Sequence, residues 1–266
     1  MRFARFTLLA ALLTLAGCNT RELDEAGNPI TDEPEVSSPC VPVVFEQTPL
    51  THCTADPARH AIRMVESDAN GNPLRSFATY AAARPSGAPP VAFAMNGGMY
   101  GEDGHAIGYY VENRQRLKSL NRREGPGNFH MLPNGVFFGE ASTDWDVWDT
   151  ERFANDIGDR PQFATQSGPM LVIAGELHPQ FAPDGDSLRI RNGVGIDPAG
   201  RAHFVISEAP VSFGRFARYF RDVAGTPNAL FLDGSVSQLW DPARGRMDSG
   251  AALGPMIIVE MRENGE

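Results

Sequence analysis

The sequence predicts an α+β fold, a single domain of mixed or antiparallel β-sheet with a few packed helices. Many short apolar runs are separated by Gly, Pro, Asn and Asp, and the clearest helical periodicity is confined to one segment. Few connections are long enough to hold a crossover helix. Short strands joined by turns are typical of antiparallel sheets and do not favour a doubly wound parallel sheet.

The chain before residue 40 is expected to lie outside this domain. Residues 1–17 have a basic start, an apolar run and a small-residue end, which together predict a secretory signal peptide. The stretch Leu15-Ala16-Gly17-Cys18 resembles a bacterial lipobox, so we expect lipid on Cys18. An ordinary signal peptide with an incidental cysteine is the alternative. Residues 18–39 are rich in Asp, Glu, Pro and Ser and predict a disordered acidic tether.

Composition and cysteine usage limit the partners. The formal net charge of -10 argues against a nucleic-acid partner, because phosphate binding needs clustered Lys and Arg. No second apolar segment is long enough to span a bilayer, so we expect membrane contact only through the lipid anchor. Asn19 stands where an Asp would resemble an inner-membrane retention signal, which favours the periplasmic face of the outer membrane. Cys40 and Cys53 form an even pair in an oxidising compartment and predict a disulfide, with two buried free thiols as the alternative.

Residues 40–266 form the predicted domain, and its elements follow in chain order. Bounded apolar runs predict strands over 60–66, 91–95, 107–112, 135–139, 170–174, 202–207, 229–232 and 255–261. Residues 73–83 carry apolar side chains on one helical face. Apolar residues at helical spacing predict the clearest helix over 213–223, with Ser212 as its N-cap and Gly225 just past its end.

Two strands end directly in polar residues followed by glycine. The run 229–232 leads into Asp233, Gly234 and Ser235, which would hold a carboxylate at the rim of a sheet. A β-turn formed by the aspartate is the alternative. The run 91–95 leads into Asn96-Gly97-Gly98, where an amide side chain is followed by two residues that permit close backbone approach. The alternative there is an ordinary hairpin turn.

Two further stretches place polar groups beside predicted strands. Thr165-Gln166-Ser167 lies between apolar residues, and buried polar groups need partners, so this stretch is expected to line a polar pocket. Arg189 and Arg191 are two residues apart in an extended segment, so they share a face that suits phosphate or carboxylate recognition. A surface strand with salt bridges is the alternative. Asp184 and Asp186 resemble a fragment of a calcium loop that lacks its remaining ligands.

Taken together, these stretches resemble the phosphodiester glycosidase family, in particular its bacterial exopolysaccharide-type branch. The family includes the lysosomal "uncovering enzyme", an N-acetylglucosamine-1-phosphodiester alpha-N-acetylglucosaminidase. The resemblance is carried, in the family's order, by residues 95–100, 132–137, 165–172, 190–196 and 232–237, and it covers roughly residues 85–260. The lysosomal relatives have a more glycine-rich stretch where this chain has Ser235 and Val236.

The resemblance implies an envelope hydrolase that cleaves the bond between a sugar's anomeric carbon and a phosphodiester, and hence a carbohydrate or sugar-phosphate substrate. Glycoside cleavage usually needs two carboxyl groups. Asp233 is the first candidate, and the second is expected among Asp197, Glu102 and Glu208.

The resemblance also implies which residues bind the substrate. Arg189 or Arg191 is expected to hold the phosphate. Asn96, Asn134 and Gln166 are expected to bind sugar hydroxyls, and Gly97, Gly98, Ser167, Asn192 and Ser235 complete the binding set. We predict no cofactor, and the sequence leaves a divalent cation open. The alternative function is a non-catalytic lipoprotein that binds carbohydrate or assists envelope polysaccharide assembly.

Overall fold

The computed structural model describes residues 37–262, which belong to one compact unit. The predicted signal peptide, the lipidated Cys18 and the tether up to residue 36 lie outside the described residues. The regular structure of the described chain consists of three β-sheets with antiparallel pairing, three α-helices and short 3-10 turns. The predicted α+β class is therefore confirmed. No helix within 37–262 combines the length and apolar character that a membrane crossing requires.

The largest sheet has seven strands. In spatial order its strands are β1 (Cys40–Phe45), β2 (Thr48–Ala55), β13 (Ala202–Ser207), β12 (Asn192–Ile196), β14 (Asn228–Phe231), β10 (Met170–Ile173) and β11 (Glu176–Leu177). Helix α3 (Phe213–Asp222) packs its apolar side chains against β10 and β14. Its N-cap is Ser212, as predicted, whose hydroxyl accepts a 3.2 Å hydrogen bond from the backbone of Arg215.

Two five-stranded sheets complete the fold. The first contains β16 (Arg246–Met247), β15 (Leu239–Asp241), β4 (Val91–Asn96), β17 (Met256–Met261) and β3 (His60–Val65), with helix α1 (Phe77–Ala83) beside it. The second contains β6 (Gln115–Lys118), β5 (Tyr110–Glu112), β9 (Phe163–Ser167), β7 (Gly135–Gly139) and β8 (Asp146–Asp149), followed by α2 (Thr150–Asp156). Short 3-10 turns cover Asn128–His130, Gly234–Val236 and Pro242–Arg244.

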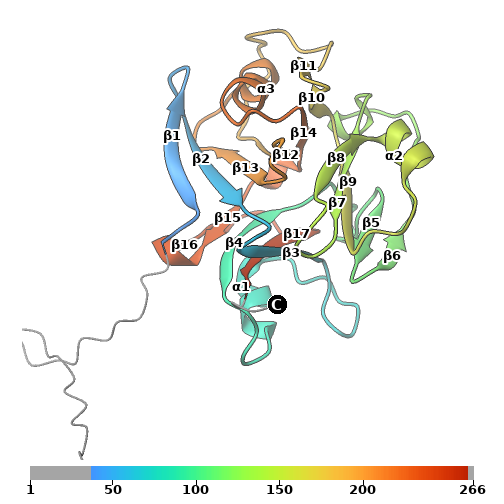
Figure 1. Ribbon diagram of the computed structural model, residues 1–266, viewed down its shortest axis with the longest axis vertical. Coiled ribbons are helices and arrows are strands. Elements are labelled where there is room, and N and C mark those ends of the chain that lie inside the picture. The colour runs from blue at the N-terminus through green and yellow to red at the C-terminus, as the bar shows by residue number, and fades with distance from the viewer. Residues whose placement is uncertain (1–36, 263–266) are drawn as a thin grey trace, which may run out of the picture. The chain divides into compact units, whose positions relative to one another are not determined.

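The three sheets share one hydrophobic core. Phe204 on β13 packs edge-to-face against Phe93 on β4 at 5.3 Å and against Phe137 on β7 at 5.8 Å between ring centroids. All three rings are fully buried, so this contact joins one strand of each sheet. In Figure 1, β4 and β17 lie below β12 and β13 and to the left of the sheet that contains β7 and β9.

The predicted strands appear within a few residues of their expected bounds, and the misses have local causes. Helix α1 begins at Phe77 and not at residue 73, because Arg75 has a positive φ of 64° and Ser76 caps the helix. Residues 107–109 precede β5 and are not part of it. The hairpin of β1 and β2 was not predicted, because its polar and proline-containing sequence lacks a clean period-two pattern.

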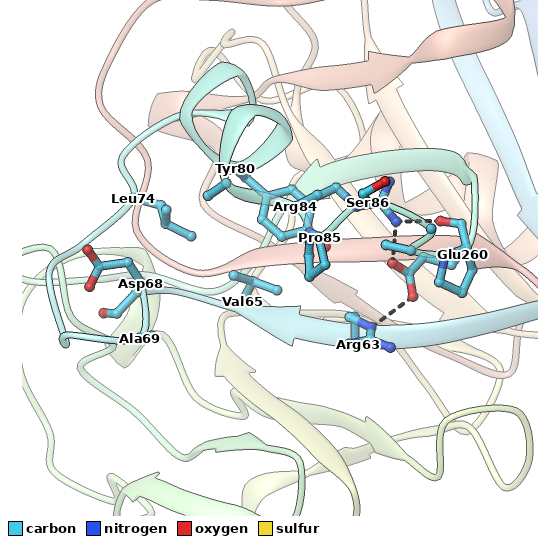
Figure 2. A pocket seen from close by; sticks show the side chains of 15 residues that line it. Arg63, Val65, Asp68, Ala69, Leu74, Tyr80, Arg84, Pro85, Ser86 and Glu260 are labelled. Atoms are coloured by element: carbon cyan, nitrogen blue, oxygen red, sulfur yellow. Dashed lines mark hydrogen bonds and ion pairs between the residues drawn. The ribbon is translucent and has the colours of Figure 1, made fainter.

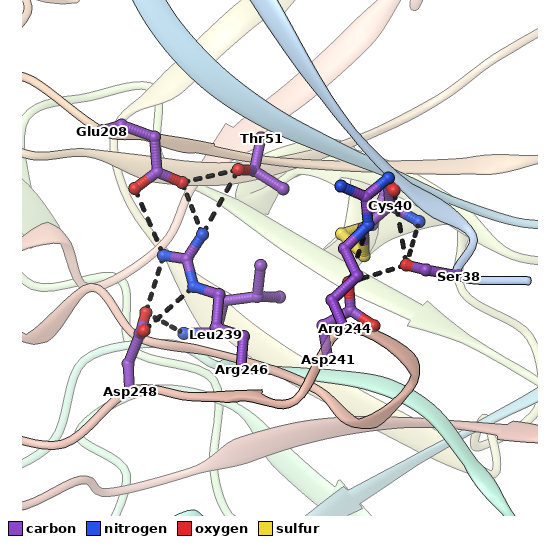
Figure 3. The surroundings of a disulfide bond; sticks show 10 residues. Ser38, Cys40, Thr51, Glu208, Leu239, Asp241, Arg244, Arg246 and Asp248 are labelled. Atoms are coloured by element: carbon purple, nitrogen blue, oxygen red, sulfur yellow. Dashed lines mark hydrogen bonds and ion pairs between the residues drawn. A yellow bond between two sulfur atoms is a disulfide. The ribbon is translucent and has the colours of Figure 1, made fainter.

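The predicted disulfide is confirmed. Cys40 and Cys53 are cross-strand partners in the β1–β2 hairpin, and both are completely buried. Near this bond, Ser38 donates a hydrogen bond to Asp241 at the end of β15 (Figure 3). The disulfide therefore holds the β1–β2 hairpin closed where Ser38 contacts the sheet that contains β15.

Replacing both cysteines by alanine should lower stability by about 3 kcal/mol, since a disulfide across 13 residues restricts the unfolded chain. For a domain of this size the melting temperature should fall by roughly 6–12 °C. Thermal unfolding of residues 37–262, wild type beside the double variant, measures the difference. A reductant should lower the wild-type melting temperature and leave that of the variant unchanged. Equal melting temperatures of wild type and variant would contradict a stabilising role for the bond.

Candidate functional site

The ends of three strands meet at the amide of Asn96, the last residue of β4. Its Nδ2 donates a 2.8 Å hydrogen bond to the backbone oxygen of Asp233, just after β14. Its Oδ1 accepts bonds of 2.9 Å from Asn192 Nδ2, at the start of β12, and from the backbone of Gln238. Three of the sequence motifs therefore converge at one point, and the convergence fixes the backbone of Asp233.

The two glycines after Asn96 bring β4 against β9 and against the Asp233 turn. The Gly97 backbone oxygen accepts a 3.1 Å hydrogen bond from Asp233 N, and Gly98 N donates to Thr165 Oγ1 at 3.1 Å. A Cβ on Gly98 would lie 2.3 Å from the backbone oxygen of Gln166, which no side chain tolerates. Gly97 and Gly98 therefore serve close packing of backbones around the site.

The Asp233 carboxyl group is buried beside the pocket and keeps one oxygen open. Its Oδ1 accepts hydrogen bonds from Ser235 N at 3.2 Å and from Ser235 Oγ at 2.5 Å. Its Oδ2 accepts none from the described residues, so that oxygen is available to a ligand. Burial raises the pKa of Asp233, and the two bonds from Ser235 oppose this increase. A buried carboxyl with a raised pKa is typical of functional sites.

Arg191 is a buried cation with no carboxylate partner among the described residues. Its side chain is 1% exposed, and its guanidinium donates to Val211 O at 2.9 Å and to Ser187 O at 2.7 Å. The guanidinium lies 3.5 Å from the ring centroid of Phe213, a close cation–π contact. Burial and the charge of Arg189 lower the pKa of Arg191 to about 10, so it stays charged at neutral pH.

One pocket brings Arg191 together with the Asp233 turn. Its volume is 370 Å³, and its lining comprises Asn128, Arg189, Ile190, Arg191, Phe231, Gly234 and Ser235. Both arginines thus face the same space, as their spacing predicts. Ser235 lines this pocket and also donates to the Asp233 carboxylate. The arrangement can hold an anion on the arginines in a pocket that adjoins the turn carrying a buried carboxyl group.

Four amides that we expected to contact substrate are instead bonded within the protein. Asn96 and Asn192 bond each other, as described above. Asn134 donates to Phe129 O at 2.8 Å and accepts from Thr150 Oγ1 at 2.7 Å. The Gln166 amide bonds the backbone of Tyr109 and Asn121. These four side chains are nearly inaccessible and do not line the Arg191 pocket, so the geometry gives them a framework role, and sugar contacts by them stay a prediction.

Ser167 also lies in the interior and not on the pocket wall. Its side chain is completely buried, and its hydroxyl has no hydrogen-bond partner within residues 37–262. The neighbouring Gly168 packs tightly, since a Cβ there would lie 2.6 Å from Asn134 Cβ and 2.9 Å from Phe129 O. The end of β9 at residues 165–168 therefore packs against the loop of residues 128–134 in the interior of the protein.

The structure does not bring a second predicted carboxylate to Asp233. Asp197 follows the far end of β12 and lies roughly 16 Å along the strand from Asn192. It binds Arg201 and His203 at 2.7 and 3.0 Å. Glu102 is exposed in the loop after Tyr100. Glu208 is bonded to Arg246 and Thr51 on the surface (Figure 3). None of the three lines the pocket.

A different pocket, of 460 Å³, lies between α1 and the edge strand β3 (Figure 2). Its polar centre is Glu260, which is paired with Arg63 at 2.8 Å and with Arg84 at 2.7 Å. Since those charges neutralise one another and no motif residue lines this pocket, its geometry is that of a structural ion-pair network. The described residues contain no group of three or more His, Cys, Asp or Glu that could hold a metal. Asp184 is paired with Arg215 and Arg218.

Sequence reasoning missed several residues that shape the pocket. Asn128 lines it from the loop before β7, while Phe213 and Phe231 contact the Arg191 guanidinium. Phe213 was predicted only as the first residue of a helix, and Phe231 only as part of a strand. No local pattern indicates that an arginine 22 or 40 residues earlier in the sequence will stack on these rings.

The sequence and the fold were compared with protein families, curated proteins and solved structures. The family model described as "Phosphodiester glycosidase" matches residues 90–257, which include every motif above. The chain belongs to the phosphodiester glycosidase family. One relative is "Uncharacterized protein YigE" from Escherichia coli (strain K12). Its sequence is 36% identical to this chain over 189 residues, which cover 70% of this chain and 72% of that protein.

Two solved structures share the fold of this phosphodiester glycosidase family member. The zebrafish N-acetylglucosamine-1-phosphodiester alpha-N-acetylglucosaminidase catalytic domain, auto-inhibited by its pro-peptide, has a TM-score of 0.57 at 14% identity, covering 84% of this chain and 82% of that one. A putative exported protein from Burkholderia pseudomallei has a TM-score of 0.54 at 10% identity, with coverage of 80% and 74%. At such identities these likenesses show the fold alone.

Asp197→Asn should reduce stability in a pH-dependent way. Burial alone would raise the pKa of Asp197, but hydrogen bonds from His203 and Arg201 together lower it to about 2. A carboxyl whose pKa is lower in the folded state stabilises the fold above its unfolded pKa, and this contribution is lost as pH falls toward 2. The variant should therefore be about 2 kcal/mol less stable at pH 7.

Urea unfolding of wild type and Asp197→Asn at several pH values tests this role. The difference in unfolding free energy should shrink from pH 4 toward pH 2. Equal stability of the two proteins at pH 7 would show that Asp197 is not held in the network described here.

Proposed function

We propose that this family member hydrolyses the glycosidic bond between a sugar's anomeric carbon and a phosphodiester. The observation that carries this proposal is the buried, carboxylate-free Arg191 in a pocket that is also lined by Ser235, which donates a hydrogen bond to Asp233. An uncompensated guanidinium in the interior costs several kcal/mol, which an anionic ligand would offset. The family, and the zebrafish enzyme whose printed name specifies a sugar-1-phosphodiester substrate, make a phosphodiester the best candidate for that anion.

The proposed binding mode places the phosphate on the arginines and the sugar toward Asp233. Arg191 has its Nε and Nη2 engaged with Val211 O and Ser187, while its Nη1 donates to no described atom. Arg189, at the more exposed side of the pocket, would bind a second phosphate oxygen. Since Val211, Ser187 and Phe213 hold the Arg191 guanidinium in place, little reorganisation would accompany binding.

Asp233 would act on the sugar in its ionised form. The glycosidic bond breaks through a transition state with positive charge at the anomeric carbon, and a carboxylate in a poorly solvated site stabilises that charge. Oδ2 is the oxygen that faces no protein donor. Water supplies the new bond to the anomeric carbon, and the phosphate departs as a monoester that is already a stable anion, so a strong general acid is unnecessary. No Asp or Glu is among the residues that line the pocket, which Asp233 adjoins through Gly234 and Ser235.

The envelope location belongs to the same proposal. A lipid at Cys18 and a tether to residue 39 would hold the domain at the periplasmic face of the outer membrane, where phosphate-bearing glycans are accessible. The sequence of residues 1–39 supports this location.

The function can be tested with matched substrates of the same sugar, a chromogenic sugar-1-phosphodiester and an aryl glycoside without phosphate. Wild type should cleave the first over a panel of sugars. Arg191→Gln should reduce kcat/KM for the phosphodiester about 100-fold, because a preorganised charged donor is lost, and Arg191→Lys should also fall short since a point charge cannot replace the planar fork. Any residual cleavage of the aryl glycoside should be unaffected.

Two outcomes would overturn the proposed function. One is a folded wild-type protein that binds the phosphodiester but cleaves no member of the panel, which would favour the non-catalytic carbohydrate-binding lipoprotein. The other is an equal loss of kcat/KM on both substrates in a folded Arg191→Gln protein, which would show that Arg191 does not bind the phosphate. Melting temperatures establish that each variant is folded.

The pH profile should report the Asp233 carboxyl group. If the ionised form is active, kcat/KM falls as pH drops through the Asp233 pKa, which burial has raised. Ser235→Ala removes the hydroxyl donor that stabilises the carboxylate, so the pKa should rise further and the acid limb should move to higher pH. Ser237→Ala is the control, since that hydroxyl bonds Asn192 and Gly234 instead. An acid limb that stays in place in Ser235→Ala would contradict the assignment.

A further inference from the structure

The segment of residues 114–123 stands apart from the rest of the chain in its charge. It contains five of the 23 Lys and Arg residues and no acidic residue, in a protein whose formal net charge is -10. It comprises strand β6, at the edge of its sheet, and the loop that follows. All four residues of β6 are exposed.

Two of the five cations are neutralised and three are not. Arg114 is paired with Glu140, and Arg122 with Glu151. Arg116, Lys118 and Arg123 are exposed and have no carboxylate partner among the described residues. We call these three residues the basic strip. Arg116 is paired with Val111 and Lys118 with Tyr110 on β5, and a β-bulge separates the two pairs, so both cations lie on β6 without simple alternation between faces.

The basic strip leads along the chain to the candidate pocket. Gln166 accepts a 2.9 Å hydrogen bond from Asn121 N and donates one of 2.7 Å to Asn121 O, which fixes the loop after Lys118. The Arg123 backbone oxygen is bonded to His130 Nδ1 at 2.7 Å. Asn128, which lies between these two residues in the sequence, lines the pocket that contains Arg191. Hydrogen bonds from Gln166 and His130 therefore fix the loop that carries Arg123, and the same loop region contributes Asn128 to the pocket.

The surface of the strip is hollowed and polar. A depression of 400 Å³ is lined by Lys118, Arg122 and Arg123 together with Ser119 and Asn121. Hydroxyl and amide groups between cations suit a ligand that carries both sugar hydroxyls and anionic groups. Leu117 is the one large apolar side chain in the segment that is strongly exposed, so the surface offers little to insert into a lipid layer.

We propose that the basic strip binds further anionic groups of an extended glycan whose reacting end occupies the Arg191 pocket. The substrate class would then be an anionic polysaccharide with repeated phosphate or similar charges. This inference rests on the proposed function and names the class of substrate that the site takes. Each exposed cation contributes only about 0.2–1 kcal/mol, so a short substrate gains nothing from the strip, whereas several simultaneous contacts add up on a polymer.

Binding is tested first, independently of turnover, with dextran sulfate and neutral dextran of equal length as probes. Wild type should bind dextran sulfate in a salt-dependent manner and should not bind dextran through this surface. The triple variant Arg116→Gln, Lys118→Gln, Arg123→Gln should bind dextran sulfate about tenfold more weakly. Arg59→Gln, which removes an exposed cation from another surface, is the control and should change the affinity less than twofold.

Turnover of the short chromogenic sugar-1-phosphodiester separates this inference from the proposed function. The triple variant should retain the wild-type kcat/KM on it. If neither wild type nor the triple variant cleaves the short substrate but the triple variant binds dextran sulfate more weakly, glycan binding by the basic strip is supported and the proposed reaction is contradicted. Unchanged affinity of the triple variant for dextran sulfate would contradict glycan binding by the basic strip. An equal loss of kcat/KM on the short substrate would contradict it as well. Strip-dependent binding to phosphatidylglycerol vesicles without binding to dextran sulfate would also overturn it.

Discussion

The hydrogen bonds of the Asn96 amide are the constraint on which the site depends. One side chain, completely buried at the end of β4, joins the start of β12 through Asn192, the turn after β14 through Asp233, and the approach to β15 through Gln238. These segments come from two different sheets. Because each bond is buried, breaking one leaves an unsatisfied polar group, and the Asp233 backbone would lose its fixed position.

The same site departs from the rules that hold elsewhere in the fold. Most buried charges in this protein are neutralised, as Glu260 is by two arginines and Asp197 by Arg201. Arg191 is buried without such a partner, and Asp233 is buried with one oxygen free. Both exceptions adjoin a single pocket. Local violations of ordinary stability rules at one place are what a ligand-binding site produces, because the ligand supplies the missing interactions.

The sequence predicted which segments carry the chemistry better than it predicted what each side chain does. Apolar runs that end in a polar residue and glycine located β4 and β14, and the spacing of Arg189 and Arg191 predicted a shared face, whereas β12 was not predicted as a strand. The roles of Asn96, Asn134 and Gln166 were not predictable, because a buried amide bonds equally well to backbone or to sugar. Asp197 was misplaced for a geometric reason, since five residues of strand carry it to the opposite end of the sheet.

The measurement that tests the account most directly is turnover and affinity of Asp233→Ala on a sugar-1-phosphodiester that wild type cleaves. Alanine is preferable to asparagine, since an asparagine before Gly234 is prone to deamidate back to aspartate. The account predicts a folded variant that still binds the phosphodiester through Arg191 but has lost at least about 100-fold in kcat. A folded Asp233→Ala protein with wild-type kcat would contradict the placement of the reaction at this carboxylate.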